Sequence, residues 1–74
     1  MVIRKDIRRG KMSPQLIRIK RLRENKKITQ KEMAELLGIH KDTYIKKEIG
    51  VSKFYVNELF KIMLILGCKE EDIF

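Results

Sequence analysis

The segment that most constrains the fold is a short one, residues 29–38, because both of its ends carry residues that begin or end helices. Thr29 and Glu32 have the spacing of a capping box, in which the two side chains satisfy free backbone N–H groups at a helix start. Gly38 stands where a left-handed residue ends a helix. Only Ile39 and His40 separate it from the next helical stretch, residues 41–48. The sequence therefore predicts two short helices joined by a tight turn.

This order of elements is the helix-turn-helix plan, a short helix, a glycine-containing turn and a second short helix. A helix is also predicted before it, because Ser13-Pro14 combines a preferred N-cap with proline at the first helical position. A further helix ends at Gly67, and a last short turn covers residues 69–74. The apolar face expected for the helix before Gly67 consists of Val56, Leu59, Phe60, Met63 and Leu66. The predicted fold class is all-α, a five-helix bundle.

Charge divides the chain unevenly. The formal net charge is +8, and residues 1–53 are positive whereas residues 54–74 are negative. A positive surface over two thirds of the chain favours a polyanionic partner. We expect two parts, a basic N-terminal arm over residues 1–12 and one domain over residues 13–74. The arm either reaches along DNA or into its minor groove, or is a vector-derived or disordered tail without a role.

Several classes of protein are excluded by what the sequence lacks. One Cys and one His are too few for an internal disulfide or a structural zinc site. We find no nucleophile–base pair, phosphate loop or metal-ligand set, so we expect no enzyme activity and no cofactor. A chain of 74 residues buries too little surface for a large cavity, so no small-molecule ligand is expected. The longest apolar run has five residues, too short for a membrane span, and no secretory signal is visible, which favours the cytoplasm.

Five stretches together resemble a known family. They are residues 22–24 (LRE), 28–39 (ITQKEMAELLGI), 47–50 (KEIG), 66–68 (LGC) and 72–74 (DIF). This pattern is similar to that of the phage repressor and Cro-type helix-turn-helix proteins, the XRE family, over about residues 15–74. The resemblance implies a transcriptional regulator that binds double-stranded operator DNA, usually as a homodimer on a palindrome. We expect a repressor that acts by occupying promoter DNA.

The resemblance also implies which side chains of residues 41–48 face the major groove: Lys41, Asp42, Ile45 and Lys46. Their chemistry fits base recognition independently. Lys41 and Lys46 can donate to guanine, Asp42 can accept from cytosine N4, and Ile45 can contact a thymine methyl. Asp42 has a second possible role, because an acid in the first turn stabilises the helix dipole.

Other positions are implied to contact phosphates or to hold the fold. Gln30, His40 and Lys53 stand at positions where the family meets the DNA backbone. A helix N-terminus such as that at Gln30 favours an anion. Arg23 and Glu48 match a buried ion pair that fixes the recognition helix on the first helix.

Two departures from the family pattern bear on the orientation of the helix predicted over residues 41–48. Tyr44 and Lys47 stand where aliphatic residues are usual. Either Tyr44 fills the core and keeps its hydroxyl near the rim, while Lys47 lays its stem on apolar surface and points its amine outward, or the helix is rotated and Ile45 and Ile49 turn inward. The two arrangements present different side chains to DNA.

Apolar residues beyond the expected core face indicate an interface. Leu64 and Ile65 widen the apolar stripe of the helix before Gly67, and an exposed apolar strip often marks a contact surface. We expect a homodimer interface there. The alternative at these two positions is that Ile65 belongs to the core and Leu64 is an isolated exposed residue. A second possible function of the chain is that of a protein-interaction module, such as an antitoxin or adaptor, that uses the same fold to hold a partner protein.

Overall fold

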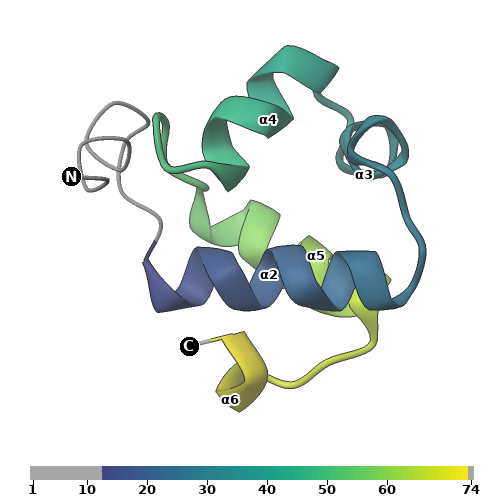
Figure 1. Ribbon diagram of the computed structural model, residues 1–74, viewed down its shortest axis with the longest axis vertical. Helices are drawn as coiled ribbons and strands as arrows, with labels where there is room; N and C mark the ends of the chain where they lie inside the picture. The colour runs from purple at the N-terminus through teal and green to yellow at the C-terminus, as the bar shows by residue number, and fades with distance from the viewer. Residues whose placement is uncertain (1–12, 74) are drawn as a thin grey trace, which may run out of the picture.

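The computed structural model describes residues 13–73, which form five helices and no strand (Figure 1). In chain order the helices are α2 (Pro14–Asn25), α3 (Gln30–Leu37), α4 (Lys41–Glu48), α5 (Val56–Leu66) and α6 (Glu70–Ile73). The predicted all-α, five-helix fold is confirmed. The basic arm expected over residues 1–12 lies outside the described residues.

Local capping explains where the first helices begin and end. The Ser13 hydroxyl accepts a hydrogen bond from the Leu16 amide at 3.3 Å, which starts α2. Thr29 Oγ1 accepts from the Glu32 amide at 3.0 Å, and Glu32 Oε1 accepts from the Thr29 amide at 2.8 Å, so the capping box of α3 is formed. Gly38, with φ +74°, then ends α3 in a conformation that favours glycine. These caps are local contacts. Because Gly38 ends α3, only residues 38–40 separate it from the start of α4.

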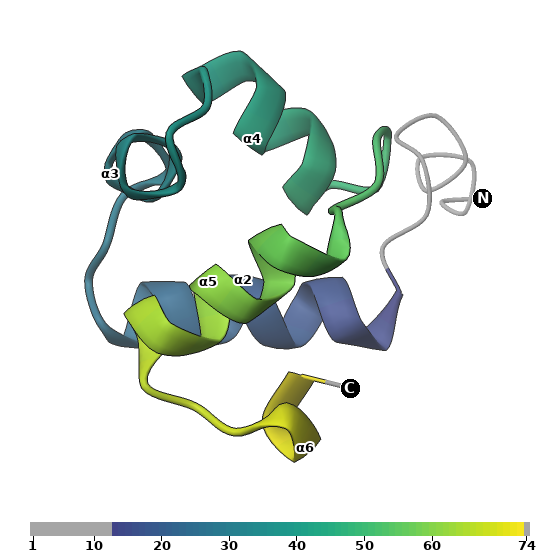
Figure 2. The same ribbon diagram turned by 180° about the vertical axis from the view of Figure 1, so that it is seen from behind.

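The helices enclose a single hydrophobic core. Helix α2 contacts α4, α5 and α6, and α3 contacts α4 and α5. In Figure 2 α5 crosses α2, with α4 beyond one side of this pair and α6 beyond the other. The buried apolar residues come from all five helices: Ile19, Met33, Ala34, Leu37, Tyr44, Leu59, Ile62, Leu66 and Ile73. Within residues 13–73, α2 and α5 pack against the inner sides of α3 and α4, and no other helix covers the outer sides of these two.

The apolar face predicted for α5 is partly wrong. Val56 and Phe60 are exposed, and the inward face includes the charged Glu58 beside Leu59. Glu58 takes a buried position because its carboxylate meets a cation on α4, as described below. Val56 and Phe60 consequently lie on the outer side of the helix.

None of the helices formed by residues 13–73 is long and apolar enough to span a membrane.

Candidate nucleic-acid interface

Helix α4 begins with a side-chain cap from His40. The His40 Nδ1 atom accepts a hydrogen bond from the Asp42 amide at 3.2 Å, and His40 itself has extended backbone angles. Lys41, Asp42 and His40 are all exposed. The first turn of α4 therefore presents a cation, an anion and an imidazole to solvent next to free backbone N–H groups.

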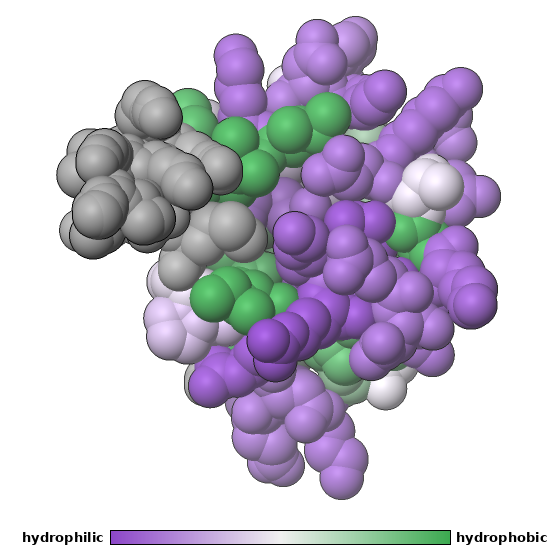
Figure 3. Space-filling model, viewed as in Figure 1, coloured by the Kyte–Doolittle hydropathy of each residue, from purple (hydrophilic) through white to green (hydrophobic). Residues whose placement is uncertain are grey.

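The two faces of α4 differ sharply. Tyr44 is completely buried and Lys47 and Glu48 are nearly so. Lys46 is exposed, like Lys41 and Asp42, whereas Ile45 is half-buried. Hydrophilic residues cover most of the face that α2, α3 and α4 present in Figure 3.

The orientation of α4 resolves the alternatives that Tyr44 and Lys47 leave open in the sequence. Tyr44 is buried in the core, whereas Ile45 and Ile49 are only half-buried, so α4 has not rotated to turn these isoleucines inward. The first alternative predicts the tyrosine hydroxyl near the rim of the molecule, and this prediction is wrong because the hydroxyl is buried. It is buried because it finds an acceptor inside the molecule, the carboxylate of Glu48.

Glu48 is the centre of a buried polar network that joins three helices. Arg23 Nε and Nη2 donate to its carboxylate at 2.8 and 3.2 Å. Gln30 Nε2 donates at 2.9 Å and the Tyr44 hydroxyl at 2.8 Å. Arg23 Nη1 also donates to the Ile28 carbonyl at 2.8 Å, so the guanidinium connects α2 to the segment before α3. The structure thus brings together Arg23 and Glu48, the two residues expected to pair.

The network shifts the ionisation of its members. Burial alone would raise the pKa of Glu48, but the hydrogen bonds from Arg23, Gln30 and Tyr44 outweigh it and lower the pKa below its ordinary value. Burial and the neighbouring Glu48 charge both raise the pKa of Tyr44. At neutral pH Glu48 is therefore an anion and Tyr44 a donor, which is the combination that their hydrogen bond requires.

Gln30 occupies the first position of α3 and is half-buried. Its side-chain amide already donates one hydrogen bond, to Glu48. An amide nitrogen has two N–H groups, so the residue that was expected to meet a phosphate is also anchored to the network that holds α4.

A second buried ion pair was not expected from the sequence. Lys47 Nζ lies 2.7 Å from both carboxylate oxygens of Glu58 on α5. The prediction that the Lys47 amine points outward is therefore wrong, because Glu58 supplies a buried acceptor. Two signals in the sequence could have indicated it: a lysine at a position of inward periodicity in α4, and a glutamate at the third position of α5.

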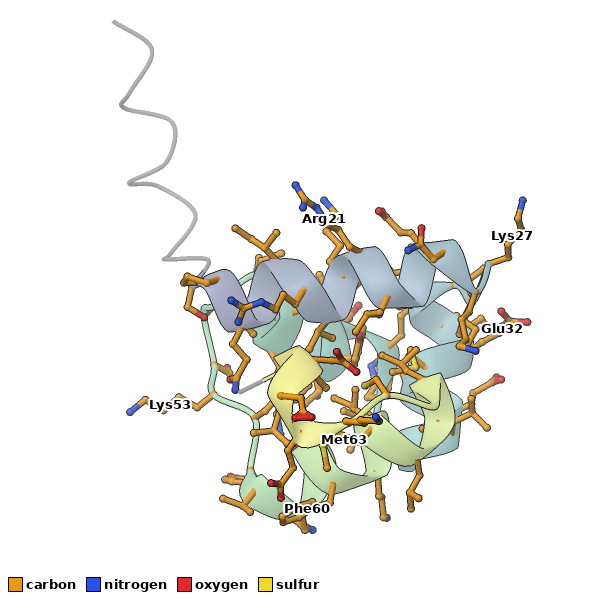
Figure 4. The ribbon with its side chains drawn as sticks, turned by 90° about the horizontal axis from the view of Figure 1, so that it is seen from below. Arg21, Lys27, Glu32, Lys53, Phe60 and Met63 are labelled. Atoms are coloured by element: carbon orange, nitrogen blue, oxygen red, sulfur yellow. The ribbon has the colours of Figure 1, made fainter. Side chains whose placement is uncertain are left out.

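The loop between α4 and α5, residues 49–55, carries the third expected phosphate contact. Lys53 is exposed and extends away from the body of the molecule (Figure 4). Ser52 and Lys53 line a shallow open pocket together with Ser13 and Gln15 at the start of α2. Lys53 therefore belongs to a segment near the N-terminus of α2, at the end of α4 opposite to His40, and its side chain extends into solvent.

The two residues expected at a dimer interface lie differently. Leu64 is 83% exposed, whereas Ile65 is half-buried and packs against the core. Val56 and Phe60, which the sequence pattern assigns to the inward face, share the exposed side of α5 with Leu64. We call Val56, Phe60 and Leu64 the α5 apolar strip. Figure 4 shows Phe60 on the side of the molecule opposite Arg21 on α2.

The side chains that could ligate a metal do not cluster in the part of the chain that the structure describes. Residues 13–73 contain no group of three or more His, Cys, Asp and Glu side chains that could hold a metal ion. Cys68 is half-buried against the core, and burial raises the pKa of its thiol. A raised thiol pKa disfavours the reactive thiolate at neutral pH.

The short helices α3 and α4, their tight turn and the exposed face of α4 define the chain as a helix-turn-helix DNA-binding domain. A family model described as helix-turn-helix matches residues 19–73. No curated protein and no solved structure matched the chain. Because the family match covers most of the 74 residues, the chain belongs to the helix-turn-helix family of Cro and XRE type. It is a DNA-binding transcriptional regulator of XRE type, from a family of DNA-binding domains and not of enzymes.

Proposed function

We propose that this protein is a sequence-specific repressor that places α4 in the major groove of operator DNA and acts by occupying a promoter. The observation that carries the proposal is the division of α4 into two faces. Lys41, Asp42 and Lys46 are exposed, while Tyr44 and Glu48 hold the opposite side inside the molecule. A major groove about 12 Å wide admits one such helix.

The exposed residues of α4 have complementary preferences among base edges. Lys41 and Lys46 donate to guanine N7 and O6, and Asp42 accepts from cytosine N4. Ile45 is half-buried, so its exposed part suits contact with a thymine methyl group. An unpaired carboxylate among phosphates is unfavourable, so Asp42 is the residue with the strongest discrimination between bases. Each good contact contributes about 1–3 kcal/mol of discrimination.

Contacts to the DNA backbone flank this face. His40 lies before α4, Lys53 after it, and Gln30 at the N-terminus of α3. The free N–H groups and the dipole of a helix N-terminus attract phosphate. We assign phosphate contacts to these three residues, which position the domain on the duplex without reading its sequence.

A second copy of the chain is the partner we propose for the α5 apolar strip. Val56, Phe60 and Leu64 are four residues apart, so they lie on one side of the helix with Phe60 at the centre. A two-fold axis near Phe60 would bring Val56 of one copy against Leu64 of the other, as a self-complementary interface requires. Ile65 borders the strip. The resulting homodimer would present two α4 helices about 34 Å apart to a palindromic operator.

The DNA proposal is tested by selection from random duplex DNA with the full chain. We expect one enriched sequence with two-fold symmetry, and an affinity that falls steeply with salt. Each neutralised phosphate adds about −0.9 to the slope of log affinity against log salt. Replacing Lys53 with Ala should reduce that slope by about 0.9 and leave the preferred sequence unchanged. A flat salt response, or no enriched sequence, would exclude the proposal.

The dimer is tested by sedimentation equilibrium with the selected duplex. Leu64→Lys places a charge in the α5 apolar strip and should weaken both self-association and binding to the palindrome, while leaving binding to a single half-site intact. Lys61→Ala on the same helix is the matched control. Equal self-association of the two variants would contradict the proposed interface.

The exposed α5 apolar strip also favours the alternative function, a module that holds a different protein, such as an antitoxin or adaptor. The selection experiment separates the two functions. An interaction module has no reason to enrich one DNA sequence, and replacement of Lys41 or Lys46 would not affect its partner binding.

A further inference from the structure

Lys47 and Glu58 form a buried ion pair that also contacts Tyr55. Both side chains of the ion pair are more than nine-tenths buried. Lys47 Nζ also lies 4.3 Å from the centroid of the Tyr55 ring, within the range of a cation–π contact. Glu58 Oε1 accepts a further hydrogen bond, at 2.8 Å, from the Tyr55 amide at the start of α5. All three residues thus meet where α4, the loop and α5 come together.

Stability alone is a weak reason for such a pair. Taking two charges out of water is costly, and apolar residues of similar volume often stabilise a fold equally well or better. The Lys47–Glu58 distance of 2.7 Å specifies one geometry, whereas apolar packing tolerates several. The pair gains a role beyond stability from the features of the molecule whose positions its geometry fixes.

The first such feature is the rotation of α4. Consecutive residues of a helix point about 100° apart. Glu48 holds α4 toward Arg23 on α2, and Lys47 holds it toward α5. Tyr44 and Glu48 already hold one side of α4 inside the molecule, and the Lys47–Glu58 pair adds an attachment in a second direction, which further restricts rotation of α4 about its axis. The exposed Lys46 directly precedes both attachments, so they fix the side of α4 from which its side chain extends.

The second feature is the loop that carries Lys53. The amides of Val51 and Ser52 donate to the Lys46 carbonyl at 2.9 and 3.1 Å, which ties the loop to the end of α4. At the other end, the Lys47–Glu58 pair ties the start of α5 to the same turn of α4. The segment between these two attachments is held at both ends, so its backbone has little conformational freedom. Lys53 lies in this segment.

We propose that Lys47 and Glu58 are positioning residues for DNA recognition: their ion pair fixes the rotation of α4 and the shape of residues 49–55 before DNA binds. This inference rests on the proposed function of α4, to which it adds two residues that do not themselves touch DNA. A preorganised interface binds its own site without ordering these elements on contact, so the pair contributes to discrimination between the operator and other DNA.

The test uses the double substitution Lys47→Met with Glu58→Gln in the full chain. It removes the ion pair, keeps the side-chain volumes similar, and leaves the net charge unchanged. Glutamine also suits the third position of a capping box, so the start of α5 is preserved. The matched control is Lys69→Met with Asp72→Asn, which removes an exposed cation and an exposed capping carboxylate near α6.

Two measurements are made on each protein. Amide hydrogen exchange of the free protein should become faster in residues 49–55 and in the last turn of α4, and stay unchanged in α2 and α3. The ratio of affinities for the selected duplex and a random duplex should fall about tenfold, equivalent to the loss of one good base contact. Affinity for random DNA should stay within about twofold, because the net charge is the same. The melting temperature should shift by less than about 8 °C.

An unchanged affinity ratio together with unchanged loop exchange would overturn the inference. So would an equal loss of affinity for both duplexes with faster exchange throughout the molecule, since that is the result of a purely structural pair. If the unmodified protein prefers no duplex, the proposed function fails, and hydrogen exchange in the free protein alone then decides whether the pair holds α4 and the loop.

Discussion

Two neighbouring residues of α4 connect the helix to the molecule through buried charge, but the two junctions are built differently. Glu48 accepts hydrogen bonds from Arg23, Gln30 and Tyr44, so it joins α2, α3 and α4. Lys47 has one carboxylate partner, Glu58, and closes the loop between α4 and α5. Breaking a junction that three helices share is expected to destabilise the core. Breaking a junction that closes one loop can change how precisely the surface residues are positioned, while the core stays folded.

The largest effect in this comparison is expected from Arg23→Met. It leaves the Glu48 carboxylate buried without its cation, and breaking such a pair costs about 3–5 kcal/mol. Urea unfolding followed by circular dichroism measures the loss. Arg21→Met, on the exposed side of α2, is the control and should change the free energy of unfolding by less than about 0.5 kcal/mol. A loss from Arg23→Met as small as that of the control would show that the network contributes little.

A smaller effect is expected from Lys47→Met alone. Glu58 loses its cation, as Glu48 does in Arg23→Met, but the Glu58 side chain is 9% exposed and the Glu48 side chain only 1%. Arg23→Met also removes the hydrogen bond to the Ile28 carbonyl, which Lys47→Met leaves in place. We therefore expect the cost of Lys47→Met near the lower end of the range of about 3–5 kcal/mol for breaking a buried pair. Adding Glu58→Gln removes the unpaired charge and should recover much of the loss. A destabilisation equal to that of Arg23→Met, measured in the same urea series, would mean that the two junctions are equivalent.

Acid sensitivity is expected to depend on the Glu48 junction. The hydrogen bonds to Glu48 lower its pKa below the ordinary value of 4.5, against the effect of burial. A lowered pKa in the folded state contributes stability that is full above pH 4.5 and is lost as the pH falls through the lowered value. Each unit of lowering corresponds to about 1.4 kcal/mol. Urea midpoints measured from neutral to acid pH should therefore fall less steeply for Glu48→Gln than for the unmodified protein. Parallel curves would exclude Glu48 as the source.

Much of the fold could be predicted because its signals are local. Ser13, Thr29 and Gly38 fix helix ends through contacts within a few residues, and such contacts are readable from the sequence. The pairing of Arg23 with Glu48 spans 25 residues, and only the resemblance to a family indicated it.

The rest depended on contacts that no periodicity reveals. Lys47 lies at an inward position of α4, but periodicity alone does not place Glu58, eleven residues later, beside its amine. The burial of Glu58 also decides which side of α5 faces the core, so Val56 and Phe60 become exposed. The buried Lys47–Glu58 pair is therefore the reason why the sequence mispredicts both the direction of the Lys47 amine and the apolar face of α5.

The central claim is that the exposed face of α4 reads bases, whereas the flanking residues bind the DNA backbone. Its most direct test measures binding to the selected duplex and to a set of duplexes with single base-pair changes. The double variant Asp42→Ala with Lys46→Ala keeps the net charge and should change the order of preference among these duplexes. Lys53→Ala should lower affinity for all of them by a similar factor. Uniform losses for both variants would contradict the assignment of base recognition to α4.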